Sequence, residues 1–247
     1  MKRYFFEIAY NGTQFFGWQR QPNNVTVQEV VEQSLSRIYS NSPIEIVGCG
    51  RTDTGVHASH YFFHADLEEH ALLEDLEHLR FKLNRMLPAS IAVFRIFPCE
   101  QHARFDARSR TYRYFITLKK DPFKTESHLY LQTPPDFHRM NEAASFFMGT
   151  QDFTSLAKLH TDVKTNICTV SKACWKRETE HTWYFEITAD RFLRNMVRST
   201  VGTLLEVGFG KIAPEDIPNI IAAKDRSAAS TSVPAHGLFL YKIDYNF

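Results

Sequence analysis

The chain has 247 residues, which suits one large domain or two small ones with a substantial core. Hydrophobic residues make up 43% and charged residues 23%, which is typical of a soluble globular protein. The 29 basic and 28 acidic residues leave a net charge of +1, so charge neither requires nor excludes nucleic acid, whose binding needs only a local basic patch.

Cysteine usage and hydropathy indicate the compartment. The four cysteines are scattered and form no C-x-x-C pair, so we expect reduced thiols. The first ten residues, MKRYFFEIAY, are too polar and have too short an apolar run for a signal peptide. No stretch approaches the apolar length that spans a membrane. We therefore expect a cytoplasmic protein with no membrane partner.

The first half of the sequence alternates strand-like and helix-like segments. Residues 3–12 predict a strand that ends in an Asn-Gly turn. Thr26 and Glu29 have the spacing of a capping box, and apolar residues then recur at helical intervals, which predicts a helix over 27–39. The other elements expected in this half are strands over 43–50, 60–66 and 89–98 and a helix over 72–87 that stops at Pro88.

The second half repeats this plan more loosely. The expected strands are 110–118, 172–178, 183–190 and 237–245, and the expected helices are 137–149 (closed by Gly149), 192–208 and 214–225. No Gly/Ser-rich linker separates the halves. The sequence therefore predicts an α+β fold of two ferredoxin-like halves, 1–102 and 103–247, that share a mixed, mainly antiparallel sheet with helices packed on it.

The segment GRTDTGVHA, residues 50–58, places one acid, Asp53, between Arg51 and His57 in a loop bounded by glycines. Asp-Thr-Gly occurs in aspartic proteases, but a single-chain protease needs a second such triplet to share one proton, and the sequence has none. One remaining interpretation is that Asp53 caps a turn. Because polar side chains crowd a glycine-bounded loop, a functional site is an equally good one.

Other residues that carry chemistry also leave alternatives open. His57, His60 and His64 lack the acid or cysteine cluster that would complete a metal site, which favours a structural or solvent-facing role. Arg194 and Arg198 lie four apart on a predicted helix. We expect them either to face solvent or to turn one guanidinium inward onto a buried acid.

Tyr112 and Tyr114 share one side of a predicted strand. The alternation of residue types along this strand, taken alone, indicates that both tyrosines belong to the core face of a half-buried strand. Because several arginines lie close by in the sequence, an aromatic surface for RNA bases is the second interpretation. Gln19 and Arg20 in GWQRQ are ambiguous in the same way.

Seven segments, taken in order, resemble a known family. They are YNGTQFFGWQRQ (10–21), GRTDTGVHA (50–58), HARFDARSRTYRY (102–114), GTQDFTSL (149–156), FLRNMVRSTVGTLLEVG (192–208), AAKDR (222–226) and GLFLYKIDY (237–245). Over nearly its full length the chain resembles the tRNA pseudouridine synthase A (TruA) family. One departure follows GVHA, where the family often has a glutamine and this chain has His60-Tyr61-Phe62; we expect altered packing behind the site.

The resemblance implies a pseudouridine synthase fold and an isomerase. The family converts uridine to pseudouridine at positions 38, 39 and 40 in the anticodon stem-loop of tRNA, without a cofactor or metal. The catalytic nucleophile falls on Asp53, the active-site tyrosine on Tyr112, and the arginine that pairs with the acid on Arg198. Arg51 corresponds to the arginine that helps to hold the base out of the stack. Family members are homodimers in which one tRNA arm crosses both subunits.

The implied chemistry leaves two choices open. Asp53 attacks either C6 of the base or C1′ of the ribose, and covalent catalysis divides one hard step into easier ones in both cases. The proton on C5 is removed with the help of Asp53 or Tyr112. The competing interpretation is a catalytically silent RNA-binding relative, against which the joint presence of Asp53, Tyr112 and Arg198 argues. The segment 156–170 varies in the family, and we expect substrate reach to depend on it.

Overall fold

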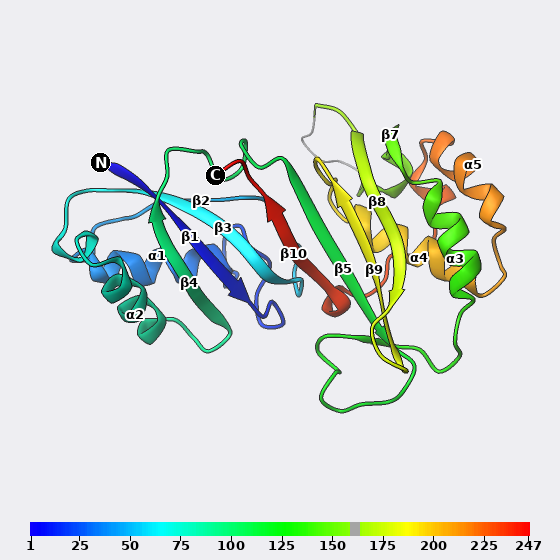
Figure 1. The fold of residues 1–247 in the computed structure, drawn as a ribbon, viewed down its shortest axis with the longest axis horizontal. Coiled ribbons are helices and arrows are strands. Elements are labelled where there is room, and N and C mark those ends of the chain that lie inside the picture. Colours follow the sequence, from blue (N-terminus) through cyan, green and yellow to red (C-terminus); the bar gives the residue numbers. More distant parts are fainter. Residues whose placement is uncertain (159–163) are drawn as a thin grey trace. The chain divides into compact units, whose positions relative to one another are not determined.

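A computed structural model describes residues 1–158 and 164–247, so part of the variable segment 156–170 lies outside the described residues. The described residues form two compact units. One consists of Met1–Arg108 and Leu240–Phe247, and the other of Ser109–Phe239. The domain ranges 1–102 and 103–247 stay a prediction; by compactness, the chain divides after Arg108 and its C-terminal residues return to the first unit (Figure 1).

The first unit is an antiparallel sheet with two helices. Its strands are β1 (Lys2–Tyr10), β2 (Ile46–Gly48), β3 (His57–Leu67), β4 (Ile91–Pro98) and, from Leu240 onward, β10 (Leu238–Asp244). β1 pairs with both β3 and β4, and β2 pairs with β3, all antiparallel. Helix α2 (Leu76–Met86) packs on β4, and helix α1 (Val27–Ile38) contacts α2 and β2. A short 3-10 turn, Ala71–Leu73, precedes α2.

The second unit is also a sheet with helices. Its strands are β5 (Ser109–Thr117), β6 (Leu129–Tyr130), β7 (Gly149–Asp152), β8 (Ile167–Arg177) and β9 (Thr182–Ala189). They pair antiparallel in the order β5-β9-β8-β7, while β6 runs parallel to β5. The helices are α3 (Phe137–Ser145), α4 (Met196–Gly208) and α5 (Ile217–Ala222), and α3 contacts both α4 and β8. Four 3-10 turns complete the unit: Thr154–Leu156, Pro214–Asp216, Arg226–Ala228 and Ala235–Gly237.

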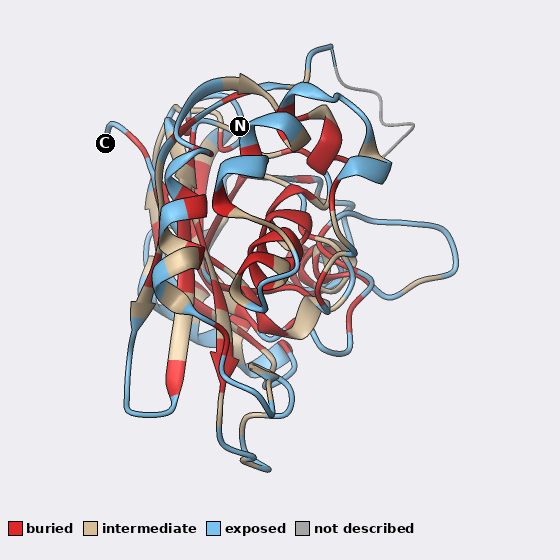
Figure 2. Ribbon diagram, turned by 90° about the vertical axis from the view of Figure 1, so that its right-hand side faces the viewer, coloured by how far each residue is buried: buried red, intermediate tan, exposed pale blue. Residues whose placement is uncertain are grey.

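The α+β class and the mainly antiparallel strand pairing are confirmed. The Thr26 side chain accepts the backbone N–H of Glu29 at 3.4 Å, which caps α1 at the predicted residue. Helix α2 ends before Pro88, because the residue before a proline is disfavoured in helical conformation. Figure 2 shows the buried residues gathered along strands and helix faces, while the connecting loops are mostly exposed.

Several predicted boundaries are wrong, and three of them matter for the site. Helix α4 begins at Met196 and not at 192, because Asn195 has a left-handed backbone (φ 68°, ψ −3°) that no α-helix includes. Helix α3 ends at Ser145, and Gly149 (φ +90°) opens β7 instead of closing the helix. Strand β8 starts at Ile167 and not at 172. Strands β6 and β7 were missed because two and four residues are too short to show alternation.

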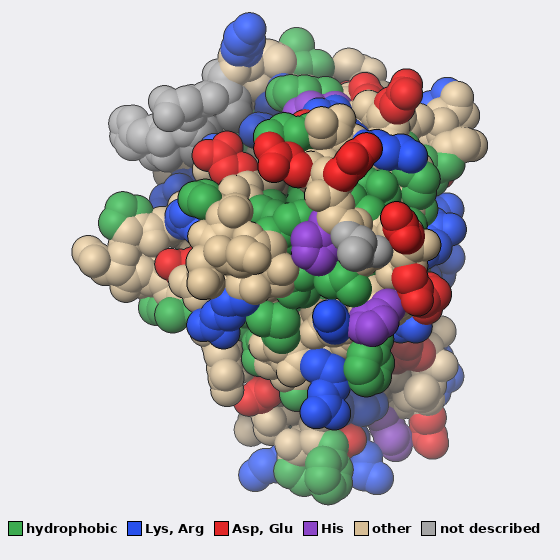
Figure 3. Space-filling model, turned by 90° about the vertical axis from the view of Figure 1, so that its left-hand side faces the viewer, with side chains coloured by type: hydrophobic (Ala, Val, Ile, Leu, Met, Phe, Trp, Pro, Cys, Tyr) green, Lys and Arg blue, Asp and Glu red, His purple; other side chains and the backbone are tan. Residues whose placement is uncertain are grey.

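The surface carries mixed charge. Figure 3 shows a face on which basic, acidic and apolar side chains are interspersed. This agrees with a chain of net charge +1. Within the described residues, no helix combines the length and the apolar character needed to cross a membrane.

Candidate active site

Asp53 lies in a loop of the first unit between β2 and β3, residues 49–56, which we call the Asp53 loop. The side chain of Asp53 is partly exposed, Arg51 is exposed, and Thr52 and Val56 are buried. The backbone N–H of Val56 donates to the carbonyl oxygen of Asp53 at 3.1 Å, closing a turn in which Gly55 has φ +76°. The buried neighbours anchor the backbone that carries the carboxylate.

A second loop, residues 11–18 after β1, fastens the Asp53 loop. The N–H of Trp18 donates to the carbonyl oxygen of Thr52 at 3.3 Å, and the N–H of Gly55 donates to that of Phe15 at 3.2 Å. The hydroxyls of Tyr10 and Thr52 are hydrogen-bonded at 2.8 Å in the interior. Because these bonds reach the loop on both sides of Asp53, they fix its backbone independently of the carboxylate.

Two glycines allow this close approach. A Cβ at Gly12 would overlap the carbonyl oxygen of Val56, and a Cβ at Gly17 would overlap that of Thr52. Gly17 also has φ +83°, in the left-handed region that favours glycine. The motif YNGTQFFGW therefore needs its glycines so that two backbones can touch.

Aromatic side chains support the Asp53 loop from below. The Tyr61 hydroxyl donates to the carbonyl oxygen of Gly50 at 2.5 Å. The rings of Trp18 and Tyr61 lie 4.2 Å apart, and both are buried. Tyr61 belongs to the segment that departs from the family pattern. A residue of that segment therefore donates the hydrogen bond that holds Gly50, at the start of the Asp53 loop.

The three histidines serve the fold. Each uses its Nδ1 to accept a backbone N–H. For His57, His60 and His64 the donors are Gly12, Ile243 and Ala103, at 3.0, 3.3 and 3.0 Å. His57 and His64 are buried, and among the described residues no three His, Cys, Asp or Glu side chains are grouped to hold a metal. These hydrogen bonds to the backbone give the three histidines a structural role.

His64 gives stability a pH dependence. Burial, with a smaller contribution from Arg3, lowers the pKa of His64 from 6.5 to about 4. Between these pH values the unfolded chain binds more protons than the folded one. The contribution of His64 to the free energy of unfolding is therefore fully present above pH 6.5. It is lost as the pH falls toward 4, which lowers the free energy of unfolding by up to about 3 kcal/mol. Urea midpoints measured across this range should show the decline.

The control for this prediction is a pair of variants. His64→Gln keeps an acceptor for the backbone but does not titrate, so its stability should change less with pH. His181→Gln removes an exposed histidine of the second unit and should leave the profile as in the wild type. Parallel profiles for His64→Gln and the wild type would contradict the assignment.

Tyr112 and Tyr114 are distinguished by their surroundings. Tyr114 is fully buried, its hydroxyl donates to the carbonyl oxygen of Pro234 at 3.0 Å, and burial raises its pKa. Tyr112 is 9% exposed and meets Phe192 edge-on, with ring centroids 5.0 Å apart. Tyr114 is therefore a core residue, whereas Tyr112 lies beside the segment that leads into α4.

Arg194 and Arg198 were predicted to lie on one helix, four residues apart and so on one face. The structure shows that they do not. Arg194 is exposed and lies before the left-handed Asn195, outside α4. Arg198 is partly buried in the first turn of α4, and its Nε donates to the carbonyl oxygen of Val233 at 2.7 Å. The N–H of Val233 in turn donates to the carbonyl oxygen of Arg198 at 3.2 Å.

The sequence also matches known proteins. The profile of a family described as tRNA pseudouridine synthase matches residues 8–106 and 143–246. The chain is 53% identical over 247 residues to tRNA pseudouridine synthase A of Parabacteroides distasonis, covering 99% of this chain and 96% of that protein. Proteins of the same name from Bacteroides fragilis and Bacillus subtilis are 48% and 38% identical, over 99% and 97% of this chain and 97% of each protein.

The chain belongs to the tRNA pseudouridine synthase family. The residues that match the family profile include the Asp53 loop, the 11–18 loop and Arg198. Tyr112 lies between the two matched ranges. The family match therefore does not test the role predicted for Tyr112, which rests on the segment HARFDARSRTYRY.

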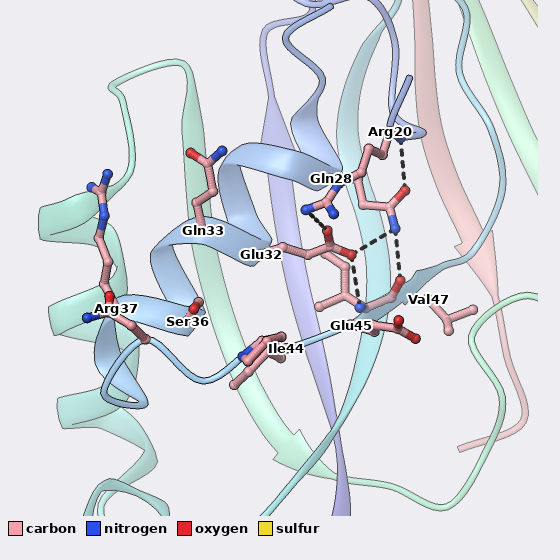
Figure 4. A pocket seen from close by; sticks show the side chains of 12 residues that line it. Arg20, Gln28, Glu32, Gln33, Ser36, Arg37, Ile44, Glu45 and Val47 are labelled. Carbon is pink, nitrogen blue, oxygen red and sulfur yellow. Dashed lines mark hydrogen bonds and ion pairs between the residues drawn. The ribbon is translucent and has the colours of Figure 1, made fainter. Parts of the chain in front are cut away.

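Sequence reasoning missed one polar network in this member of the family. Glu32 of α1 is only 6% exposed and forms an ion pair with Arg20 at 2.5 Å. It accepts from the Gln28 side chain at 2.9 Å and from the backbone N–H of Ile46 at 3.2 Å. Figure 4 shows the Glu32 side chain extending from α1 toward the backbone beside Val47, where these contacts converge.

This network borders a cavity of about 580 Å³ and ties three segments together. Glu32 belongs to α1, Arg20 follows the 11–18 loop, and Ile46 begins the strand that enters the Asp53 loop. A buried carboxylate needs such partners, because an unpaired buried charge is costly. The available signal was the spacing of Glu32, which lies three residues before the apolar Leu35 and so shares part of a helix face with it.

Proposed function

We propose that this chain isomerises uridine to pseudouridine at positions 38, 39 and 40 in the anticodon stem-loop of tRNA, with Asp53 as nucleophile. The observation that carries the proposal is the Asp53 loop itself. In a chain of this family, one partly exposed carboxylate sits on a backbone bound from both sides by the 11–18 loop. Rigid support of a reacting group is what an enzyme site requires and a turn cap does not.

The reaction rearranges one base without any other reactant. The N1–C1′ bond breaks, the uracil turns, a C5–C1′ bond forms, the hydrogen on C5 leaves as a proton, and N1 gains a proton. Asp53 forms a transient bond to C6 of the base or to C1′ of the ribose, which divides the exchange into easier steps. Proton removal from C5 is assigned to Asp53 or Tyr112.

The remaining site residues have supporting roles in this proposal. A stacked base must leave the helix before it reacts, which costs a few kcal/mol. Arg51 is exposed on the Asp53 loop, where a guanidinium is suited to hold the extruded base. Arg198 is assigned the pairing with the catalytic acid, because a nearby positive charge keeps a carboxylate ionised. Tyr112 is assigned a place against the target base.

The proposed partners are the anticodon arm of tRNA and a second copy of this chain, in the cytoplasm. Support for RNA binding comes from a local excess of positive charge in the second unit. Arg113, Lys172 and Lys176 surround one buried carboxylate, that of Glu186, at 2.7, 2.5 and 3.5 Å. The net charge of +1 therefore does not prevent a basic surface.

Binding to tRNA should depend steeply on salt. Each phosphate that a cation neutralises releases counterions, so the logarithm of affinity falls linearly with the logarithm of salt concentration. With about six phosphate contacts, affinity should fall about 10³-fold between roughly 50 and 200 mM salt. Filter binding or anisotropy with a tRNA transcript measures this slope. Affinity that does not change with salt would contradict the proposed basic surface.

The proposed activity is tested by tritium release from tRNA transcripts labelled at C5 of uridine. Formation of pseudouridine must displace that hydrogen, so the wild-type protein should release tritium. Mapping the product should place pseudouridine at positions 38, 39 and 40. Modification of other uridines would correct the site preference. Tight binding without release from any tRNA would indicate a silent RNA-binding relative instead.

A further inference from the structure

The AAKDR motif runs into a segment, residues 225–233, that crosses helix α4 and that we call the strap. A Cβ at Gly202 of α4 would overlap the carbonyl oxygen of Thr231, so the strap backbone lies directly on the helix there. At the next helix residue, the Thr203 hydroxyl accepts the backbone N–H of Ser230 at 3.2 Å. The middle of the strap is therefore fixed against α4.

Arg226 holds the strap in its folded shape. Its guanidinium donates to the carbonyl oxygens of Ala229 and Ser230, both at 3.0 Å, and to the hydroxyl of Ser232 at 3.2 Å. Ser232 also accepts from the side chain of Asn195 at 2.6 Å, and Asn195 is the residue directly before α4. Arginine suits this task because its planar fork presents several donors in set directions.

The strap ends at the residue that holds Arg198. Val233 follows Ser232 directly, and its carbonyl oxygen accepts from the Nε of Arg198 at 2.7 Å. Its N–H donates to the carbonyl oxygen of Arg198 at 3.2 Å. With Nε occupied by Val233, the direction of the rest of the guanidinium depends on where the strap places that carbonyl.

We propose that Arg226 is a positioning residue that orients the Arg198 guanidinium through Ser232 and Val233. The inference rests on the proposed function, in which Arg198 pairs with the catalytic acid. A charged group that is already oriented when the reaction begins stabilises the transition state more than a charged group that must first reorganise. Loss of Arg226 removes the donor to three strap oxygens, so the end of the strap holds the Val233 carbonyl less firmly in the direction that orients Arg198.

The test compares kcat and KM in the tritium-release assay. Arg226→Gln should lower kcat by about 10- to 100-fold, as expected for a misplaced catalytic partner, with little change in KM. The rate is expressed per folded molecule, with the folded fraction taken from thermal unfolding of the same preparation. Loss of folding alone would then leave kcat unchanged.

Two further comparisons guard against a general effect on folding. Ser232→Ala removes the shared acceptor and should lower kcat, while Ser232→Thr keeps the hydroxyl and should restore it. Arg177→Gln is the matched control, because Arg177 holds the carbonyl oxygens of Thr179 and Glu180, both at 3.0 Å, in a turn of the same unit. Arg177→Gln should keep the wild-type kcat.

A double variant separates this inference from the function on which it rests. If Arg226 acts only through Arg198, adding Arg226→Gln to Arg198→Ala should not lower kcat further. Additive losses would overturn the inference. The inference would also be overturned if the Arg226→Gln variant kept the wild-type kcat while the Arg198→Ala variant had a reduced kcat. Full activity of Arg198→Ala itself would instead refute the role proposed for Arg198.

Discussion

Asp53→Asn is expected to abolish tritium release from C5-labelled uridine in tRNA while the protein stays folded and binds tRNA. The amide has nearly the same shape as the carboxylate but is not a nucleophile, so turnover should fall by more than about 10⁴-fold. The loop should persist, because Trp18 and Gly55 hold it through backbone atoms and not through the carboxylate. Thermal unfolding and tRNA affinity, measured beside turnover, check that the loss is chemical.

Asp66→Asn is the matched control for this variant. Asp66 lies in the same unit and its carboxylate pairs with Arg3 at 2.8 Å on the surface. Removing this charge should cost little stability, as for most exposed ion pairs, and should leave turnover unchanged. Tritium release by Asp53→Asn near the wild-type rate would remove Asp53 from the centre of the mechanism.

Arg198→Ala should impair catalysis far more than folding. Loss of a charge that stabilises the reacting carboxylate should lower kcat by about 10²- to 10³-fold. The fold loses the hydrogen bond from Nε to Val233, which is worth about 1–3 kcal/mol for a charged donor. Steady-state kinetics and urea unfolding of the same preparation compare the two losses.

Arg194→Ala is the control for Arg198→Ala. Arg194 is exposed and lies outside α4, so its removal should leave kcat close to the wild-type value. Arg198→Lys keeps a positive charge but lacks the Nε–H that Val233 holds, and should fall between alanine and the wild type. Unchanged turnover of Arg198→Ala, or equal losses at Arg194 and Arg198, would contradict the assignment.

Local pattern was enough to locate most helices and strands. Thr26 marks the start of α1 because an N-cap is a contact between residues three apart. The start of α4 escaped prediction because Asn195 adopts a left-handed backbone, where its side chain reaches Ser232 in the strap. That contact joins segments far apart in sequence, and no periodicity reports it.

For the site, the family motifs in the sequence singled out Asp53, Arg51, Tyr112 and Arg198. Residue spacing alone could not choose Tyr112 over Tyr114, whereas burial and the bond to Pro234 mark Tyr114 as a core residue. Likewise, the pairing of the three histidines with backbone N–H groups follows from their neighbours in space.

Sequence by itself determined the α+β class, the family and the identity of the candidate acid, because propensity, apolar period and motif order are all properties of the linear chain. Tertiary structure alone decided how those parts are held. It showed that the 11–18 loop binds the Asp53 loop, that Glu32 ties Arg20 to Ile46, and that Val233 of the strap holds Arg198. The physical reason is that hydrogen bonds and close packing between distant segments depend on distances in space, which composition and periodicity do not contain.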